Sequence, residues 1–199
     1  MKKKLKLPNK IVVASFNTGK IPEIKQLFGE NAIKFLSISE FIKFPPEENG
    51  KSFKENSLIK ARNAYQKSGI ASIADDSGLC VKALQGEPGI HSARWAGRNK
   101  NFYNAMKTIE KKLHEHSDKR ACFICCLSLI LSKEQEFTFQ GRVNGKLTFP
   151  PRGKNGFGYD PIFIPTGKNN TFGEMDPIKK EAISHRFEAF KKLKETFVV

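Results

Sequence analysis

The longest apolar stretch of the chain, from Ala121 to Leu131, limits the folds that the sequence allows. It reads ACFICCLSLIL and contains one polar residue, Ser128. A run of this kind is typical of a strand buried in a sheet. It is well short of the roughly 20 apolar residues that a membrane-spanning helix needs. We therefore expect a soluble protein with a long buried strand and no membrane partner.

Shorter apolar runs and helical patterns alternate along the rest of the chain. Further strands are predicted over 10–14, 33–38, 71–74, 79–81 and 136–143, the last pairing antiparallel with 121–131. Helices are predicted over 18–28, 52–68, 101–115 and 178–197, and the Gly/Pro-rich segment 150–165 is expected to be irregular. This order favours an α/β fold with a mixed sheet. We expect one domain over 1–199, with residues 1–9 as a frayed basic extension.

The chain is strongly basic, with a formal net charge of +15. Such an excess suits a protein that binds nucleic acid or polyphosphate. The lysines are scattered, however, which is typical of a Lys-rich composition rather than of a binding stripe. We expect no nucleic-acid partner, and a nucleic-acid-binding module is the competing hypothesis.

Four cysteines, Cys80, Cys122, Cys125 and Cys126, are too few and too clustered for a disulfide framework. Cys122 and Cys125 have zinc-like spacing but lack a second pair of ligands at a matching distance. Core thiols indicate a reducing compartment. No apolar segment of a signal peptide follows the first lysines, so we expect a cytoplasmic protein.

Two adjacent carboxylates, Asp75 and Asp76, follow the apolar run 70–74, where the sequence predicts a turn at Ser77-Gly78. Like charges at the edge of a core repel, so one must be protonated or both need a cation. A second acidic pair, Glu47-Glu48, lies in another loop. Carboxylate oxygens are the ligands that Mg²⁺ prefers. The alternative is a simple Asx turn without a metal.

Two segments carry groups that suit phosphates. Ser15 to Lys20 (SFNTGK) lies between a strand and a helix, where backbone N–H groups and a lysine can bind an anion. It lacks the spacing of a P-loop, and Asn17 acting only as a helix cap is the alternative. In helix 52–68, Lys60 shares a polar face with Glu55, Asn56 and Asn63, which a solvated helix would also show.

Two later segments suit a nucleobase. Glycines on both sides of Phe157 allow close approach of a flat ligand, and Asp160 can accept hydrogen bonds from a base edge. A plain hairpin connection is the alternative. Near the start of the last helix, Lys180 suits a phosphate and Arg186 a carbonyl oxygen. Together these groups match the parts of a nucleoside triphosphate.

In this order the motifs resemble the inosine triphosphate pyrophosphatase family, the Ham1-like pyrophosphatases of non-canonical purine nucleoside triphosphates. The segments that carry the resemblance are SFNTGK (15–20), FKENSLIKA (53–61), ADDSGL (74–79), PGIHSARW (88–95), GFGYDP (156–161) and SHR (184–186). The resemblance spans residues 11 to 195.

The resemblance implies an elongated α/β fold with two lobes and a substrate groove between them, and a homodimer. It implies Mg²⁺-dependent hydrolysis of dITP, ITP and XTP to the monophosphate and pyrophosphate. Another abnormal nucleotide, such as a modified pyrimidine, is an alternative substrate.

The resemblance also assigns roles by position. Asp76 matches the catalytic base, and Glu48 and Asp76 match metal ligands. The positions that match substrate binding are Ser15, Phe16, Asn17, Thr18, Gly19, Lys20, Lys60, Ser77 and Lys180, and those that match base recognition are Phe157, Gly158, Tyr159, Asp160, His185 and Arg186. Members of the family often carry Gly at the position of Phe16.

Overall fold

The computed structural model describes residues 4–17, 20–29, 33–114 and 116–198. The chain forms two compact units. Unit 1 comprises Met1–Asp76, Cys126–Gly141 and Glu188–Val199, and unit 2 comprises Ser77–Cys125 and Arg142–Phe187. None of the helices in these described ranges is both long and apolar enough to cross a membrane.

The main sheet has six strands in the order β3-β2-β4-β5-β6-β7. They are β2 (Lys10–Val13), β3 (Lys34–Ser37), β4 (Ser72–Val81), β5 (Arg120–Ile130), β6 (Glu136–Leu147) and β7 (Phe163–Pro165). Strand β2 runs parallel to β3 and to β4, while β6 and β7 are antiparallel. The α/β class and the mixed sheet are thus confirmed. The short β7 lies in the segment predicted to be irregular.

Strand β4 differs from its prediction. The sequence predicts two strands separated by a turn at Ser77-Gly78, but Ser72–Val81 is one continuous strand. Successive side chains of a strand point to opposite faces, so Asp75 and Asp76 are separated by the backbone. Each carboxylate also meets a lysine. The repulsion that favoured a turn is therefore relieved within the strand, and the predicted turn is wrong.

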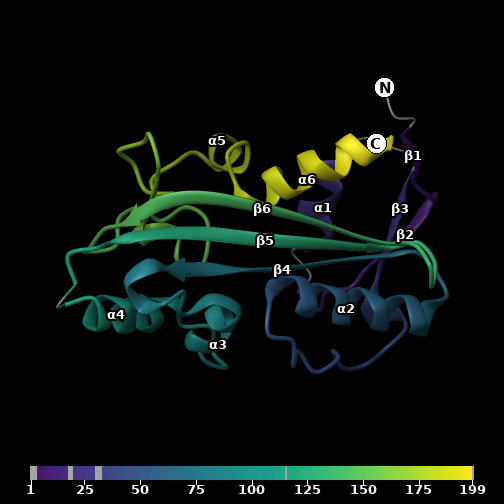
Figure 1. Ribbon diagram of the computed structural model, residues 1–199, viewed down its shortest axis with the longest axis horizontal. Helices are drawn as coiled ribbons and strands as arrows, with labels where there is room; N and C mark the ends of the chain where they lie inside the picture. Colours follow the sequence, from purple (N-terminus) through teal and green to yellow (C-terminus); the bar gives the residue numbers. More distant parts are fainter. Residues whose placement is uncertain (1–3, 18–19, 30–32, 115, 199) are drawn as a thin grey trace. The chain divides into compact units, whose positions relative to one another are not determined.

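In unit 1, helices cover both faces of the sheet. Figure 1 shows α2 (Phe53–Ser68) on one face, and α1 (Lys20–Phe28) and α6 (His185–Thr196) on the other. The ends of α2 lie where the sequence predicts them. The Ser52 hydroxyl accepts a hydrogen bond from Glu55 N at 3.1 Å, and Gly69 ends the helix with a φ of 67°.

In unit 2, α3 (Ser92–Trp95) and α4 (Phe102–Lys112) lie along β4 (Figure 1). The apolar face of α4 supplies Ile109 to a core that also contains Leu79, Phe123 and Phe163. Asn101 caps α4 by accepting a hydrogen bond from Asn104 N at 3.1 Å. Residues of the segment after β6, such as Tyr159 and Phe172, also belong to this core. Their packing anchors the loops of that segment.

The last predicted helix is broken. The structure has α5 (Pro177–Glu181) and then α6, separated by a turn that ends at Ser184. The Ser184 hydroxyl accepts a hydrogen bond from Phe187 N at 3.0 Å, so it caps a new helix. The break fixes Lys180 and His185 on different helices.

The two ends of the chain are paired in unit 1. Strand β1 (Leu5–Lys6) runs parallel to β8 (Phe197–Val198). The sequence places Leu5 and Lys6 in the extension expected to be frayed, so backbone pairing with a distant segment orders them instead.

Candidate functional site

Unit 1 gathers two lysines and three carboxylates at the middle of β4. Lys20, the first residue of α1, donates a hydrogen bond to Asp75 at 2.8 Å. Lys60, on α2, lies 3.0 Å from Asp76 Oδ1 and 3.2 Å from Glu48 Oε1. Alternation along β4 explains the arrangement, because it directs one aspartate toward each helix. We call these five residues the unit 1 cluster.

Electrostatics set the protonation of this cluster. Burial raises the pKa of Asp76 to about 6, with the attraction of Lys60 opposing and the charges of Glu48 and Asp75 assisting the rise. Burial alone would lower the pKa of Lys60, but Asp76, Glu48 and Asp75 together raise it. With all groups ionised, three carboxylates face two ammonium groups. The cluster therefore has capacity for a further cation.

Glu48 and Asp76 are the donors that fit a divalent metal. Both contact the same Lys60 ammonium, so their oxygens converge on one small region. Within the described ranges, no group of three or more His, Cys, Asp or Glu side chains is arranged to hold a metal. Two carboxylates suffice for Mg²⁺, which commonly completes its coordination with water and substrate phosphate oxygens.

Asn56 is a residue of this region that the sequence analysis did not select. It is fully buried on α2, one turn before Lys60. Its Oδ1 accepts a hydrogen bond from Gly50 N at 2.9 Å, and its Nδ2 makes a long contact of 3.5 Å with Asp76 Oδ2. One amide therefore joins the loop that carries Glu48 to Asp76. Its position on the polar face of α2 was the only available signal.

The turn between β2 and α1 is only partly described. Ser15 Oγ accepts a hydrogen bond from Asn17 N at 3.1 Å, and Asn17 O accepts one from Lys20 N at 3.0 Å. Phe16 is exposed. The predicted binding residues Thr18 and Gly19 lie outside the described residues. The described part thus places Lys20 at the beginning of the helix, as predicted.

Unit 2 also contains a buried lysine–aspartate pair. Lys180 and Asp160 are 7% and 3% exposed, and Lys180 Nζ lies 3.2 Å from Asp160 Oδ2. The same oxygen accepts a hydrogen bond from Phe157 N at 2.9 Å. Burial raises the pKa of Asp160, while Lys180, the Phe157 N–H and Arg186 oppose the rise. We call Phe157, Asp160, Phe172 and Lys180 the unit 2 cluster.

Aromatic rings border this second pair. The Lys180 ammonium lies 5.5 Å from the ring centroids of both Phe157 and Phe172. Phe172 is buried, but the Phe157 ring is 56% exposed. An exposed ring on a loop whose backbone is fixed by Asp160 offers a flat surface for stacking.

Two glycines shape the loop that holds Phe157. Gly156 and Gly158 have φ values of 73° and 67°, in the left-handed region. A side chain at Gly156 would collide with the Asp160 carboxylate. The Gly-Phe-Gly pattern is therefore needed for the loop to close on Asp160.

The remaining predicted residues lie at different depths. The Tyr159 ring belongs to the core, and its hydroxyl donates a hydrogen bond to Ser92 O at 2.9 Å. His185 is buried and stacks on Phe123, with centroids 4.9 Å apart and planes at 13°. Arg186 is 3% exposed, and Ser77 is half-buried in β4. These side chains are held rigidly by their packing.

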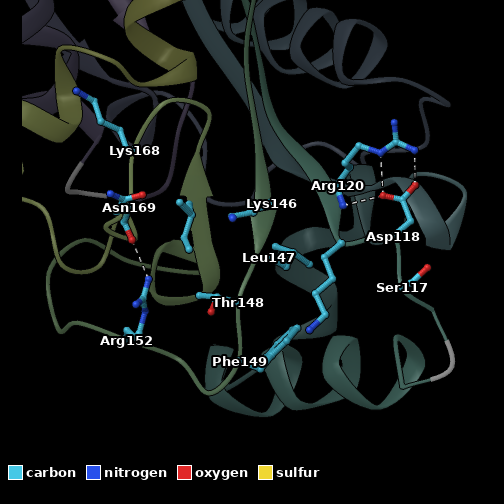
Figure 2. Close-up of a pocket in the computed structure, with 12 residues that line it drawn as sticks. Ser117, Asp118, Arg120, Lys146, Leu147, Thr148, Phe149, Arg152, Lys168 and Asn169 are labelled. Atoms are coloured by element: carbon cyan, nitrogen blue, oxygen red, sulfur yellow. Dashed lines mark hydrogen bonds and ion pairs between the residues drawn. The ribbon is translucent and has the colours of Figure 1, made fainter.

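A basic pocket in unit 2 contains none of the predicted residues. Its volume is about 580 Å³, and Figure 2 shows Arg120, Lys146, Arg152 and Lys168 around it. Asp118 binds Arg120 through two hydrogen bonds of 2.8 and 2.7 Å, as the dashed lines in Figure 2 indicate. Much of the positive charge around the pocket is thus exposed or already paired with a carboxylate. The pocket also lacks the buried, converging polar groups of the unit 1 and unit 2 clusters.

Comparisons with known proteins agree on one family. The model of the Ham1 family matches residues 11–196. A dITP/XTP pyrophosphatase of Caulobacter vibrioides is 46% identical over 187 residues, covering 93% of this chain and 96% of that protein. A dITP/XTP pyrophosphatase of Rhodospirillum centenum is 46% identical over 186 residues, covering 92% of each.

Solved structures give the same result. A HAM1 protein from Coxiella burnetii aligns with a TM-score of 0.89 at 38% identity, covering 94% of this chain and 98% of that one. The Ham1 protein of Staphylococcus aureus aligns with a TM-score of 0.86 at 40% identity, covering 94% and 96%. Likeness at this level extends over nearly the whole chain.

Proposed function

The chain belongs to the Ham1 family, and on that premise we propose that it is a dITP/XTP pyrophosphatase. It hydrolyses non-canonical purine nucleoside triphosphates, dITP, ITP and XTP, to the monophosphate and pyrophosphate. The strongest support within the structure is the Lys60 ammonium shared by Asp76 and Glu48. An ammonium group held between two carboxylates is already in position to bind the oxygens of a polyphosphate.

Asp76 is the proposed catalytic base. Its pKa of about 6 leaves it ionised at neutral pH, yet close enough to that pH to accept a proton from water. The attacking water adds to phosphorus as its proton passes to Asp76, and the bond to pyrophosphate breaks. Asn56 keeps Asp76 oriented through its amide.

Two lysines stabilise the charge that develops on the leaving pyrophosphate. Lys20 and Lys60 are held by carboxylates in the resting protein, so phosphate oxygens can replace those partners without bringing new charges into place. Mg²⁺, when bound to Glu48 and Asp76, would neutralise phosphate charge and orient the triphosphate. Ser15 to Lys20 would supply donors to the same phosphates.

The unit 2 cluster is proposed to recognise the base. The exposed Phe157 ring stacks on the purine, and the loop of Gly158 to Asp160 lies along its edge. Arg186 donates to the 6-oxo group, which adenine lacks, so adenine leaves a donor unpaired. His185 and Lys180 complete the proposed set, with Ser77 on the phosphate side.

We also propose a homodimer, as the family resemblance implies, and a cytoplasmic location, which the core thiols favour. Light scattering coupled to size-exclusion chromatography tests the dimer directly. A mass of one chain at micromolar concentration would remove it from the proposal.

A substrate panel tests the function. Purified protein with Mg²⁺ is given dITP, ITP, XTP, dATP, dGTP and a deaminated or modified pyrimidine triphosphate, and pyrophosphate release is measured. The deaminated purines are expected to react at least about 100-fold faster than dATP, a ratio that unpaired polar groups can supply. Equal rates on all of them would reject the specificity, and a preference for the pyrimidine would replace the substrate class.

A further inference from the structure

Two cysteines of unit 2 lie side by side on neighbouring strands. Cys80 is on β4 and Cys122 is on β5, which are adjacent in the sheet. Both side chains line one pocket, and the two thiols are close enough for each to shift the pKa of the other. None of the four cysteines forms a disulfide. Cys80 and Cys122 are thus neighbours that are not bonded.

The pair points away from the core of unit 2. The strand neighbours of Cys80, Leu79 and Val81, belong to that core, as do Ala121 and Phe123 on either side of Cys122. Because strand side chains alternate, both thiols project from the opposite face of the sheet. There they line a pocket of about 550 Å³, and Cys80 is only half-buried. Cys122 is 5% exposed, so a small molecule reaches the pair through the pocket on the side of Cys80.

The pocket is electropositive. It is lined by Lys82, Arg120 and Arg142 along with the two cysteines, and the described lining includes no acidic side chain, although Arg120 is paired with Asp118 beside it. The neighbouring Cys80 lowers the pKa of the Cys122 thiol, against the effect of burial and with help from Arg142. The proximity of Cys122 raises the pKa of Cys80. One sulfur is thus suited to act as a thiolate while the other keeps its proton.

We propose that Cys80 and Cys122 form a redox-active dithiol, which a hydroperoxide converts into an intrachain disulfide. The Cys122 thiolate attacks the peroxide oxygen, the O–O bond breaks, and the leaving hydroxide takes up a proton to become water. The resulting sulfenic acid is attacked by the Cys80 sulfur, which forms the S–S bond and releases a second water. Each thiol loses one electron and one proton. The peroxide gains these two electrons and two protons.

Sheet geometry permits this bond. Neighbouring strands lie about 4.8 Å apart, so two cysteines that face each other across them fall inside the range of Cα separations that disulfides span. The positive side chains around the pocket stabilise the thiolate that starts the reaction. Neither cysteine belongs to the unit 1 or unit 2 cluster, so the inference is independent of the proposed function.

The other two cysteines provide controls within the same chain. Cys125 and Cys126 are 0% and 1% exposed. Burial raises the pKa of Cys126, which disfavours its thiolate. They should remain reduced under conditions that oxidise the proposed pair.

The test treats the reduced full-length protein with an equimolar amount of hydrogen peroxide at pH 7, then blocks remaining thiols with iodoacetamide in denaturant, because Cys125 and Cys126 are buried in the folded protein. We expect an intact mass lower by about 2 Da before blocking, two alkylated thiols instead of four, and a linked peptide containing Cys80 and Cys122. Dithiothreitol should restore all four thiols.

Single variants separate the steps. Cys122→Ser should abolish the disulfide, and Cys80→Ser should leave a sulfenic acid on Cys122 that dimedone traps. Cys126→Ser should behave as the wild type, and Arg142→Gln should slow oxidation several-fold. Circular dichroism checks that each variant is folded. If one variant does not fold, the linked peptide identified in the wild-type protein still tests the proposal.

Several results would overturn the proposal. These are a linked peptide joining other cysteines, a disulfide between two chains on a non-reducing gel, and equal oxidation of Cys125 or Cys126 in the folded wild type. Absence of any disulfide after peroxide treatment would overturn it as well.

Discussion

Two lysine–aspartate pairs, one in each unit, have the same chemistry and different neighbours. Lys60 and Asp76 are 3.0 Å apart in unit 1, and Lys180 and Asp160 are 3.2 Å apart in unit 2. In unit 1 the neighbours are further carboxylates, whereas in unit 2 they are aromatic rings and the Phe157 N–H. An ion pair is therefore not a site by itself; its surroundings decide what it can do.

The difference follows from how each charge is satisfied. Lys60 is shared by two carboxylates, so the unit 1 cluster retains excess negative charge that a metal can neutralise. Asp160 accepts from both Lys180 and the Phe157 backbone, so its charge fixes a loop. We therefore propose that the unit 1 cluster supplies the reacting groups and the unit 2 cluster the recognition surface.

The largest expected effect comes from Asp76→Asn, with Asp160→Asn as the matched change in the other pair. Loss of a general base should lower kcat by about 10³-fold, because that is the usual contribution of such a group. Asp160→Asn should act mainly on KM, since it loosens the Phe157 loop. Steady-state kinetics with dITP measures both, and equal losses of kcat would break the comparison.

The second effect concerns pH in the metal-free protein. The folded pKa of Asp76, about 6, exceeds the value near 4 of an unfolded aspartate, so between these pH values the folded state binds more protons. Asp76 should therefore reduce the free energy of unfolding by up to about 3 kcal/mol as the pH rises from 4 to 6. Urea unfolding across this range measures the slope.

Asp76→Asn is the control for this pH dependence, because an amide does not titrate there. The variant should lose the corresponding part of the slope. An unchanged slope would mean that burial does not raise the pKa of Asp76, and the proposed role of Asp76 as a base tuned to near-neutral pH would lose its support.

Asn56→Ala should weaken metal use by about 10- to 100-fold, the usual cost of removing a group that orients a metal ligand. The change releases both the Gly50 N–H and Asp76. Activity is titrated against Mg²⁺ concentration, with Asn63→Ala on the same helix as control. A lower kcat at saturating Mg²⁺ with unchanged Mg²⁺ affinity would assign Asn56 to another role.

The smallest effect is expected from Phe157→Ala. Loss of base stacking should raise KM for dITP about 10-fold and leave kcat nearly unchanged, since stacking on an aromatic ring contributes about 1–3 kcal/mol per base. Tyr103→Ala, which removes another exposed ring of unit 2, is the control. A change in kcat rather than KM would place Phe157 in the chemical step.

Local signals predicted a good part of this structure. Ser52 and Gly69 mark the ends of α2 because caps depend on adjacent residues. Lys20, Lys60, Asp76 and Glu48 could be selected because their types suit a metal and phosphates, and three of them meet at the Lys60 ammonium.

Nonlocal contacts account for what the sequence did not reveal. The continuity of β4 depends on lysines from two helices, and the Asn56 contact depends on how the loop of Gly50 folds back. The contact of Cys80 with Cys122 depends on strand register. Ser184 caps α6 through a contact with a nearby residue, Phe187. The apolar periodicity continues across Ser184, so the sequence predicted one helix where the structure has α5 and α6.

Phosphorus NMR of dITP incubated with the protein and Mg²⁺ tests the central claim most directly, because it identifies which bond is cut and whether Asp76 is needed. The account predicts dIMP and pyrophosphate in equal amounts, with no turnover by Asp76→Asn on the same timescale. Formation of dIDP and orthophosphate, or full activity of Asp76→Asn, would contradict it.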